Sequence, residues 1–95
     1  MDQQEHSERG FRVKGRVQGV GFRWWAVEQA QGRGLRGWVR NREDGSVEVQ
    51  AVGPVGAMDA FFQDLKEGPP AARVERVEEV PSQGAGQEAG VRIRQ

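Results

Sequence analysis

The residues best suited to chemistry in this chain form one glycine-bearing stretch, Gly15-Arg16-Val17-Gln18-Gly19-Val20-Gly21-Phe22-Arg23. The apolar periodicity changes within it from that of a strand to that of a helix, so a tight loop is expected between the two. Successive main-chain N–H groups in such a loop, together with the helix N-terminus, can form a concave site for an anion such as phosphate. The residues that we expect to form this site are Gln18, Gly19, Val20, Gly21 and Phe22.

Arg23 is expected in the first turn of the helix, where a cation is unfavourable beside the positive end of the helix dipole. A bound anion would remove that conflict, and a planar guanidinium can hold two phosphate oxygens at once. An ordinary glycine turn beside a solvated arginine explains the same residues equally well. Because the stretch lacks the Gly-Lys-Ser or Gly-Lys-Thr of the nucleotide-binding P-loop, ATP binding is disfavoured.

A second candidate is Asn41, which ends a short extended run just before the turn Arg42-Glu43-Asp44-Gly45. Asparagine at such a position usually serves the turn itself. Taken alone, Asn41 therefore gives little indication of catalysis.

Composition excludes several classes of mechanism. The 95 residues include no cysteine, so there is no thiolate nucleophile, disulfide or sulfur ligand for a metal. The 14 basic and 14 acidic side chains cancel, so no overall field attracts nucleic acid or an anionic membrane. No cluster of histidines and carboxylates has the spacing of metal ligands, and no apolar run reaches the roughly 18 to 20 residues that cross a bilayer. We expect no metal, no cofactor and a cytoplasmic protein.

The hydrophobic pattern predicts five strands and two helices, each helix with one apolar stripe. The order βαββαβ, followed by a C-terminal strand, is typical of an α+β, ferredoxin-like two-layer sandwich with both helices on one face of an antiparallel or mixed sheet. Residues 1–8 are expected to form a flexible tail and residues 9–95 a single domain. The expected strands are 9–17, 35–41, 46–52, 74–80 and 91–94, and the expected helices are 22–31 and 54–67.

Two segments together resemble the signatures of the acylphosphatase family, and the likeness extends over about residues 9–94. The first is Gly15-x-Val17-Gln18-Gly19-Val20-x-Phe22-Arg23, and the second is Gly37-Trp38-Val39-Arg40-Asn41-x-x-x-Gly45-x-Val47. The sequence departs from the family at Arg33 and Val91, where the family usually has an apolar and an aromatic residue.

This resemblance implies a monomeric, metal-independent enzyme that hydrolyses acyl phosphates to a carboxylate and inorganic phosphate. It also implies residue roles. The main-chain amides from Gln18 to Arg23 and the Arg23 side chain would hold the phosphoryl group, while the Asn41 side chain would orient the attacking water. Both catalytic residues are present in this sequence.

Two other functions remain open at this stage, both on the same fold. One is a non-catalytic domain that recognises acyl phosphate or carbamoyl phosphate, although such a binder has no need of Asn41. The other is nucleic-acid binding on a sheet face, suggested by the arginines at 12, 16, 36, 40 and 42. The absence of aromatic residues from 47–52 and the zero net charge disfavour it.

Overall fold

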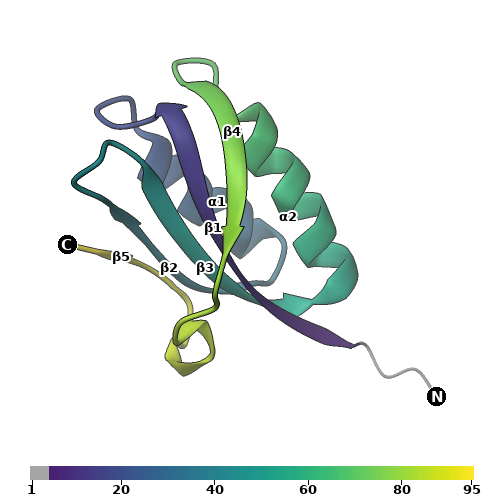
Figure 1. The fold of residues 1–95 in the computed structure, drawn as a ribbon. Coiled ribbons are helices and arrows are strands. Elements are labelled where there is room, and N and C mark those ends of the chain that lie inside the picture. The colour runs from purple at the N-terminus through teal and green to yellow at the C-terminus, as the bar shows by residue number, and fades with distance from the viewer. Residues whose placement is uncertain (1–4) are drawn as a thin grey trace.

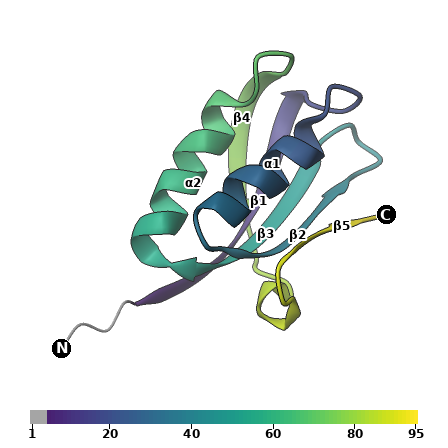
Figure 2. The same cartoon turned by 180° about the vertical axis from the view of Figure 1, so that it is seen from behind.

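The computed structural model describes residues 5–95 and places two helices on one face of a five-stranded sheet (Figures 1 and 2). The strand order is β4-β1-β3-β2-β5, and all neighbours are antiparallel except β2 and β5, which are parallel. The predicted α+β fold is therefore confirmed. The elements are β1 (His6–Arg16), α1 (Phe22–Gly32), β2 (Arg36–Asn41), β3 (Val47–Pro54), α2 (Val55–Glu67), β4 (Arg73–Val80), the short 3-10 helix η1 (Ala85–Gln87) and β5 (Val91–Arg94).

Strand β1 begins earlier than the sequence predicted. Residues 6–8 pair with residues 52–54 of β3, and the Val55 amide donates a hydrogen bond of 2.9 Å to the Glu5 carbonyl. Main-chain hydrogen bonds form whatever the side chains are, so a polar segment without apolar alternation can extend a strand. The first strand therefore begins at His6 and not at residue 9 as expected, and residues 1–4 of the expected tail lie outside the described residues.

Successive side chains along each strand point to opposite faces of the sheet. One face is covered by the helices, and the other is called the open face here. Phe11 and Val13 of β1 are fully buried beneath the helices, as are Val47 and Val49 of β3. The helices contribute apolar residues at helical spacing to the same core, which are Phe22, Ala26 and Ala30 from α1 and Met58, Phe61 and Leu65 from α2. This core fixes the position of the α1 N-terminus over the end of the sheet (Figure 2).

The adjacent tryptophans at the start of α1 point in different directions. Trp25 packs against the core with its ring centroid 5.2 Å from that of Phe22, whereas Trp24 is 68% exposed. The sequence left open which of the two is buried, and the structure shows that Trp25 is partly buried against the core while Trp24 is not.

Arg33, which stands where the resembling family usually has an apolar residue, links the two helices. Its Nε and Nη2 atoms donate hydrogen bonds of 2.6 and 3.0 Å to the two carboxylate oxygens of Asp64 on α2. The arginine at position 33 therefore has a structural role, because its bidentate pair with Asp64 joins the end of α1 to α2.

The segment between β4 and β5 crosses one end of the open face. The Trp38 indole N–H donates to the Gln83 carbonyl at 3.0 Å, and the Gln50 side-chain amide donates to the Pro81 carbonyl at 3.1 Å. Trp38 is only 2% exposed as a result. This crossing brings β5 alongside the outer edge of β2.

Candidate active site

The loop between β1 and α1 leaves the helix N-terminus without a side-chain cap. Gly21 is the N-cap residue, with a φ of 78°, and no side chain forms a capping hydrogen bond there. Gly19 also has a positive φ, of 76°. A Cβ atom at either position would meet nothing within 4 Å, so the requirement for glycine is one of backbone conformation and not of space. The first N–H groups of α1 are therefore available to a ligand.

Arg23 lies in the first turn of α1 and is partly buried. Within residues 5–95, no carboxylate forms an ion pair with its guanidinium, and the first turn of α1 contains no acidic residue. A cation at this end of a helix is unfavourable on its own. The position thus suits an arginine whose partner is an external anion.

Asn41 is the last residue of β2 and pairs with Val47 of β3. Because side chains alternate along a strand, Asn41 lies on the same face of the sheet as Val39 and Val47, which is the face that carries α1. Its carboxamide oxygen is buried and accepts no hydrogen bond from the described residues. An unsatisfied buried acceptor costs about 1–3 kcal/mol, so its presence calls for an explanation.

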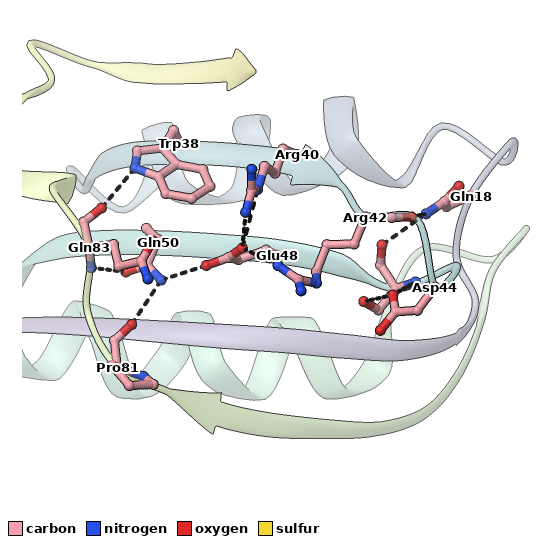
Figure 3. Close-up of polar contacts among 10 residues, drawn as sticks. Gln18, Trp38, Arg40, Arg42, Asp44, Glu48, Gln50, Pro81 and Gln83 are labelled. Carbon is pink, nitrogen blue, oxygen red and sulfur yellow. Dashed lines mark hydrogen bonds and ion pairs between the residues drawn. The ribbon is translucent and has the colours of Figure 1, made fainter. Parts of the chain in front are cut away.

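Gln18 joins the loop to the turn that follows Asn41 (Figure 3). Its side-chain amide donates hydrogen bonds of 2.8 and 2.9 Å to the carbonyls of Arg42 and Ser46. The same turn is closed by a hydrogen bond of 2.9 Å from the Arg42 amide to the Ser46 carbonyl. The structure therefore brings the predicted phosphate loop and the segment of Asn41 together. The sequence predicted only the main-chain amide of Gln18 as functional and missed this use of the side chain.

Asp44 serves the turn itself. Its carboxylate accepts hydrogen bonds from the Ser46 hydroxyl and from the Ser46 amide, the latter at 3.0 Å. These two bonds, the hydroxyl first, lower the pKa of Asp44 below its usual value. A carboxylate held ionised in this way is unsuited to act as a general base near neutral pH.

Glu48 is a buried carboxylate on the open face, and the sequence analysis did not single it out. Its side chain is 3% exposed and accepts hydrogen bonds from Arg40 at 3.2 Å, Arg42 at 3.0 Å and Gln50 at 3.0 Å (Figure 3). Burial acts to raise the pKa of Glu48, but the hydrogen bonds from Gln50, Arg40 and Arg42 outweigh it and lower the pKa. Glu48 is therefore an anion in the folded protein. The only feature of the sequence that points to Glu48 is its position among the polar residues that alternate with apolar residues along β3.

A cavity of about 560 Å³ opens beside Asn41. Its lining comes from the end of β2, the turn after it and the residue after β5. The lining residues are Arg40, Asn41, Arg42, Glu43, Asp44 and Gln95. Within residues 5–95, no three His, Asp or Glu side chains are grouped so as to hold a metal ion, and neither helix has the length and apolar character needed to span a membrane.

A family model described as acylphosphatase matches residues 9–93. The chain belongs to the acylphosphatase family. An acylphosphatase of Rhizorhabdus wittichii is 48% identical over 77 residues, which are 81% of this chain and 78% of the relative. The crystal structure of acylphosphatase from Bacillus subtilis is similar with a TM-score of 0.85 at 38% identity, covering 93% of this chain and 98% of that one. An acylphosphatase structure from Coxiella burnetii has a TM-score of 0.84 at 34% identity, covering 99% of this chain and all of that one.

These likenesses confirm the family and the enzyme class that the sequence predicted, an acylphosphatase and thus a hydrolase. They also confirm the ferredoxin-like arrangement, because acylphosphatase structures match nearly the whole chain. The roles of Arg23, Asn41 and residues 18–22 stay predictions, as do the monomeric state and the cytoplasmic location.

Proposed function

We propose that this acylphosphatase holds the phosphoryl group of an acyl phosphate on the main-chain amides of residues 18–23 and on the Arg23 guanidinium. Asn41 orients a water molecule for direct attack on phosphorus. The buried carboxamide oxygen of Asn41, which lacks a partner in the described residues, carries this proposal. The uncapped N-terminus of α1 and the unpaired Arg23 support it, because both suit an anion.

The reaction needs no general base from the protein. Water donates one hydrogen bond to the Asn41 carboxamide oxygen, which leaves an oxygen lone pair directed at phosphorus. The new P–O bond forms as the bond to the acyl oxygen breaks, and the carboxylate leaves with the bonding electrons. A phosphoryl oxygen takes the proton of the water, because neither an amide nor a guanidinium can accept it near neutral pH. Phosphoryl transfer depends mainly on positioning and charge stabilisation, which these groups supply.

Substrate recognition centres on the phosphate and permits varied acyl groups. The proposed contacts are all to the phosphoryl group or to the water. The products are a carboxylate and inorganic phosphate, and no metal, cofactor or nucleic acid takes part. Phe11 and Trp38, the phenylalanine and tryptophan of the strands, are both buried and cannot stack bases on the sheet.

The test is hydrolysis of benzoyl phosphate by the purified chain in excess EDTA. We expect rapid turnover that falls by about 100-fold or more in Asn41→Ala, with the inhibition constant of inorganic phosphate nearly unchanged. Gln31→Ala, at an exposed position of α1, is the matched control and should behave as the unaltered protein. Phosphate binding without turnover would instead support a recognition domain. Turnover restored only by added Mg²⁺ would contradict the metal-free mechanism.

A further inference from the structure

We infer that Glu48 is a positioning residue for Asn41, acting from the opposite face of the sheet. This inference rests on the proposed function, since it needs Asn41 to orient the water. Glu48 touches neither the loop nor Arg23 in the described contacts, and its own partners are Arg40, Arg42 and Gln50. Its influence on the reaction must therefore pass through the main chain.

The two arginines bound by Glu48 are the residues on either side of Asn41. Arg40 donates to one carboxylate oxygen of Glu48 through both Nε and Nη2, each at 3.2 Å, and Arg42 donates to the same oxygen at 3.0 Å. The second oxygen accepts from Gln50 at 3.0 Å. Figure 3 shows Glu48 between these partners along the open face. One buried anion thus holds both neighbours of the residue that would orient the water.

This arrangement fixes the direction in which the Asn41 side chain leaves the backbone. Side chains alternate between faces along a strand, so a residue whose neighbours are both held on one face points to the other. Asn41 is at the very end of β2, where the last strand pair is Asn41 with Val47 and the turn begins. Without Glu48, the end of β2 would lose the side-chain contacts that hold Arg40 and Arg42 on the open face, and a strand end frays more easily than its middle.

The same anion also steadies the contact between the turn and the phosphate loop. Arg42 is held by Glu48 through its side chain and accepts the hydrogen bond from Gln18 through its carbonyl. A displacement of Arg42 would therefore change the position of Asn41 relative to the loop. Since misplacement of a reacting group by about 1 Å can cost about 100-fold in rate, this linkage matters for turnover more than for phosphate binding.

The test compares Glu48→Gln with Glu78→Gln. Glu78 also pairs with cations on the open face, Lys14 and Arg76, and its replacement removes the same charge. With benzoyl phosphate, we expect Glu48→Gln to lower kcat by about 10-fold or more while the inhibition constant of inorganic phosphate changes by less than about 2-fold. Glu78→Gln should leave both values unchanged. A kcat within about 2-fold of the unaltered protein in folded Glu48→Gln would overturn the inference.

A double-variant comparison separates positioning from a general loss of structure. If Glu48 acts through Asn41, adding Glu48→Gln to Asn41→Ala should lower kcat no further. A further 10-fold loss in the double variant would overturn the inference, because Glu48 would then act independently of Asn41. Full activity of Asn41→Ala would instead refute the proposed function itself. Should Glu48→Gln fail to fold, Arg42→Gln cuts the link to the turn, leaves Glu48 paired with Arg40, and should show the same loss of kcat.

Discussion

The side-chain amide of Gln18 donates a hydrogen bond of 2.8 Å to the carbonyl of Arg42, and this contact joins two segments that lie far apart in the sequence. Gln18 belongs to the loop before α1, and Arg42 directly follows Asn41. The position of the proposed phosphate site relative to the proposed water site is therefore held by a hydrogen bond from a loop side chain to the main chain of the turn.

Replacing Gln18 with methionine should separate the loop from the turn. Methionine is similar in size but cannot donate, so the Arg42 and Ser46 carbonyls lose their side-chain partner. We expect the free energy of unfolding to fall by about 1–3 kcal/mol and phosphate inhibition to weaken. Urea denaturation and inhibition by inorganic phosphate measure the two effects. Gln63→Met, at an exposed position of α2, is the control, and equal effects in both variants would contradict the linkage.

Arg23→Lys should lower kcat/KM for benzoyl phosphate by about 100-fold or more, because lysine keeps the charge but loses the two-pronged contact with the phosphoryl oxygens. Steady-state kinetics measures this directly. Arg92→Lys makes the same exchange at a side chain that is 69% exposed on β5 and should have no effect. Near-normal turnover in Arg23→Lys would remove Arg23 from the mechanism.

Two glycine-to-alanine exchanges on α1 should have opposite effects on stability. Gly21→Ala forces a side chain into the left-handed conformation at φ 78° and should cost about 1–2 kcal/mol. Gly32→Ala lies in the helix, where an added Cβ meets nothing within 4 Å, and should add about 0.5–1 kcal/mol of stability. Chemical denaturation of the two variants measures both. Equal shifts in the same direction would show that the Gly21 conformation is not required.

The lowered pKa of Glu48 predicts a loss of stability in acid. The carboxylate faces Arg12 on β1, Arg40 on β2 and Arg42 in the turn, with Gln50 beside it. Because the pKa lies below its ordinary value of 4.5, the stabilisation is complete above that pH and disappears as the pH falls through the folded-state value.

The difference in the free energy of unfolding between the unaltered protein and Glu48→Gln should therefore shrink as the pH falls from about 6 to about 3. Denaturation of both proteins across this range measures it. Glu79, whose pKa is lowered by its hydrogen bonds to Arg9, titrates equally in both proteins and cancels in the difference. A difference that stays constant with pH would show that Glu48 is not the titrating group.

The sequence predicted the order of the elements because most of them have a clear local signal, whereas residues 74–80 fit neither period cleanly and are assigned as a strand on their β-branched residues. The alternation through Phe11 and Val13 marks β1, the helical spacing of Met58, Phe61 and Leu65 marks α2, and Asp44-Gly45 marks the hairpin turn. The sequence also marked the loop before α1 and Arg23 as candidate anion-binding residues. Arg23 stood out because a cation at a helix N-terminus conflicts with the helix dipole. Hydrophobic periodicity and an unfavourably placed charge both depend on residues close together in the sequence, so they can be recognised without the structure.

The roles of Gln18 and Glu48 could not be predicted, because each depends on partners from other elements. The side chain of Gln18 donates to the carbonyl of Ser46, which is 28 residues further along the chain. Every residue has a main-chain carbonyl, so the sequence does not indicate which carbonyl a side chain will reach. Glu48 looks like an ordinary polar residue of a half-exposed strand, because its partners Arg40 and Arg42 come from β2 and from the turn that follows it. Residues 6–8 were missed for a similar reason, since only main-chain pairing holds them in β1.

Strand β1 lies between β3 and β4, and this placement affects how the protein folds. Gly10 pairs with Gln50 on one side and with Val80 on the other. Sheets that depend on such distant pairings fold slowly, on a scale of about milliseconds to seconds. During synthesis, at about 5–20 residues per second, β1 has an unpaired edge until β4 emerges from the ribosome. The strand of this sheet that is synthesised first is therefore among the last to be paired on both edges.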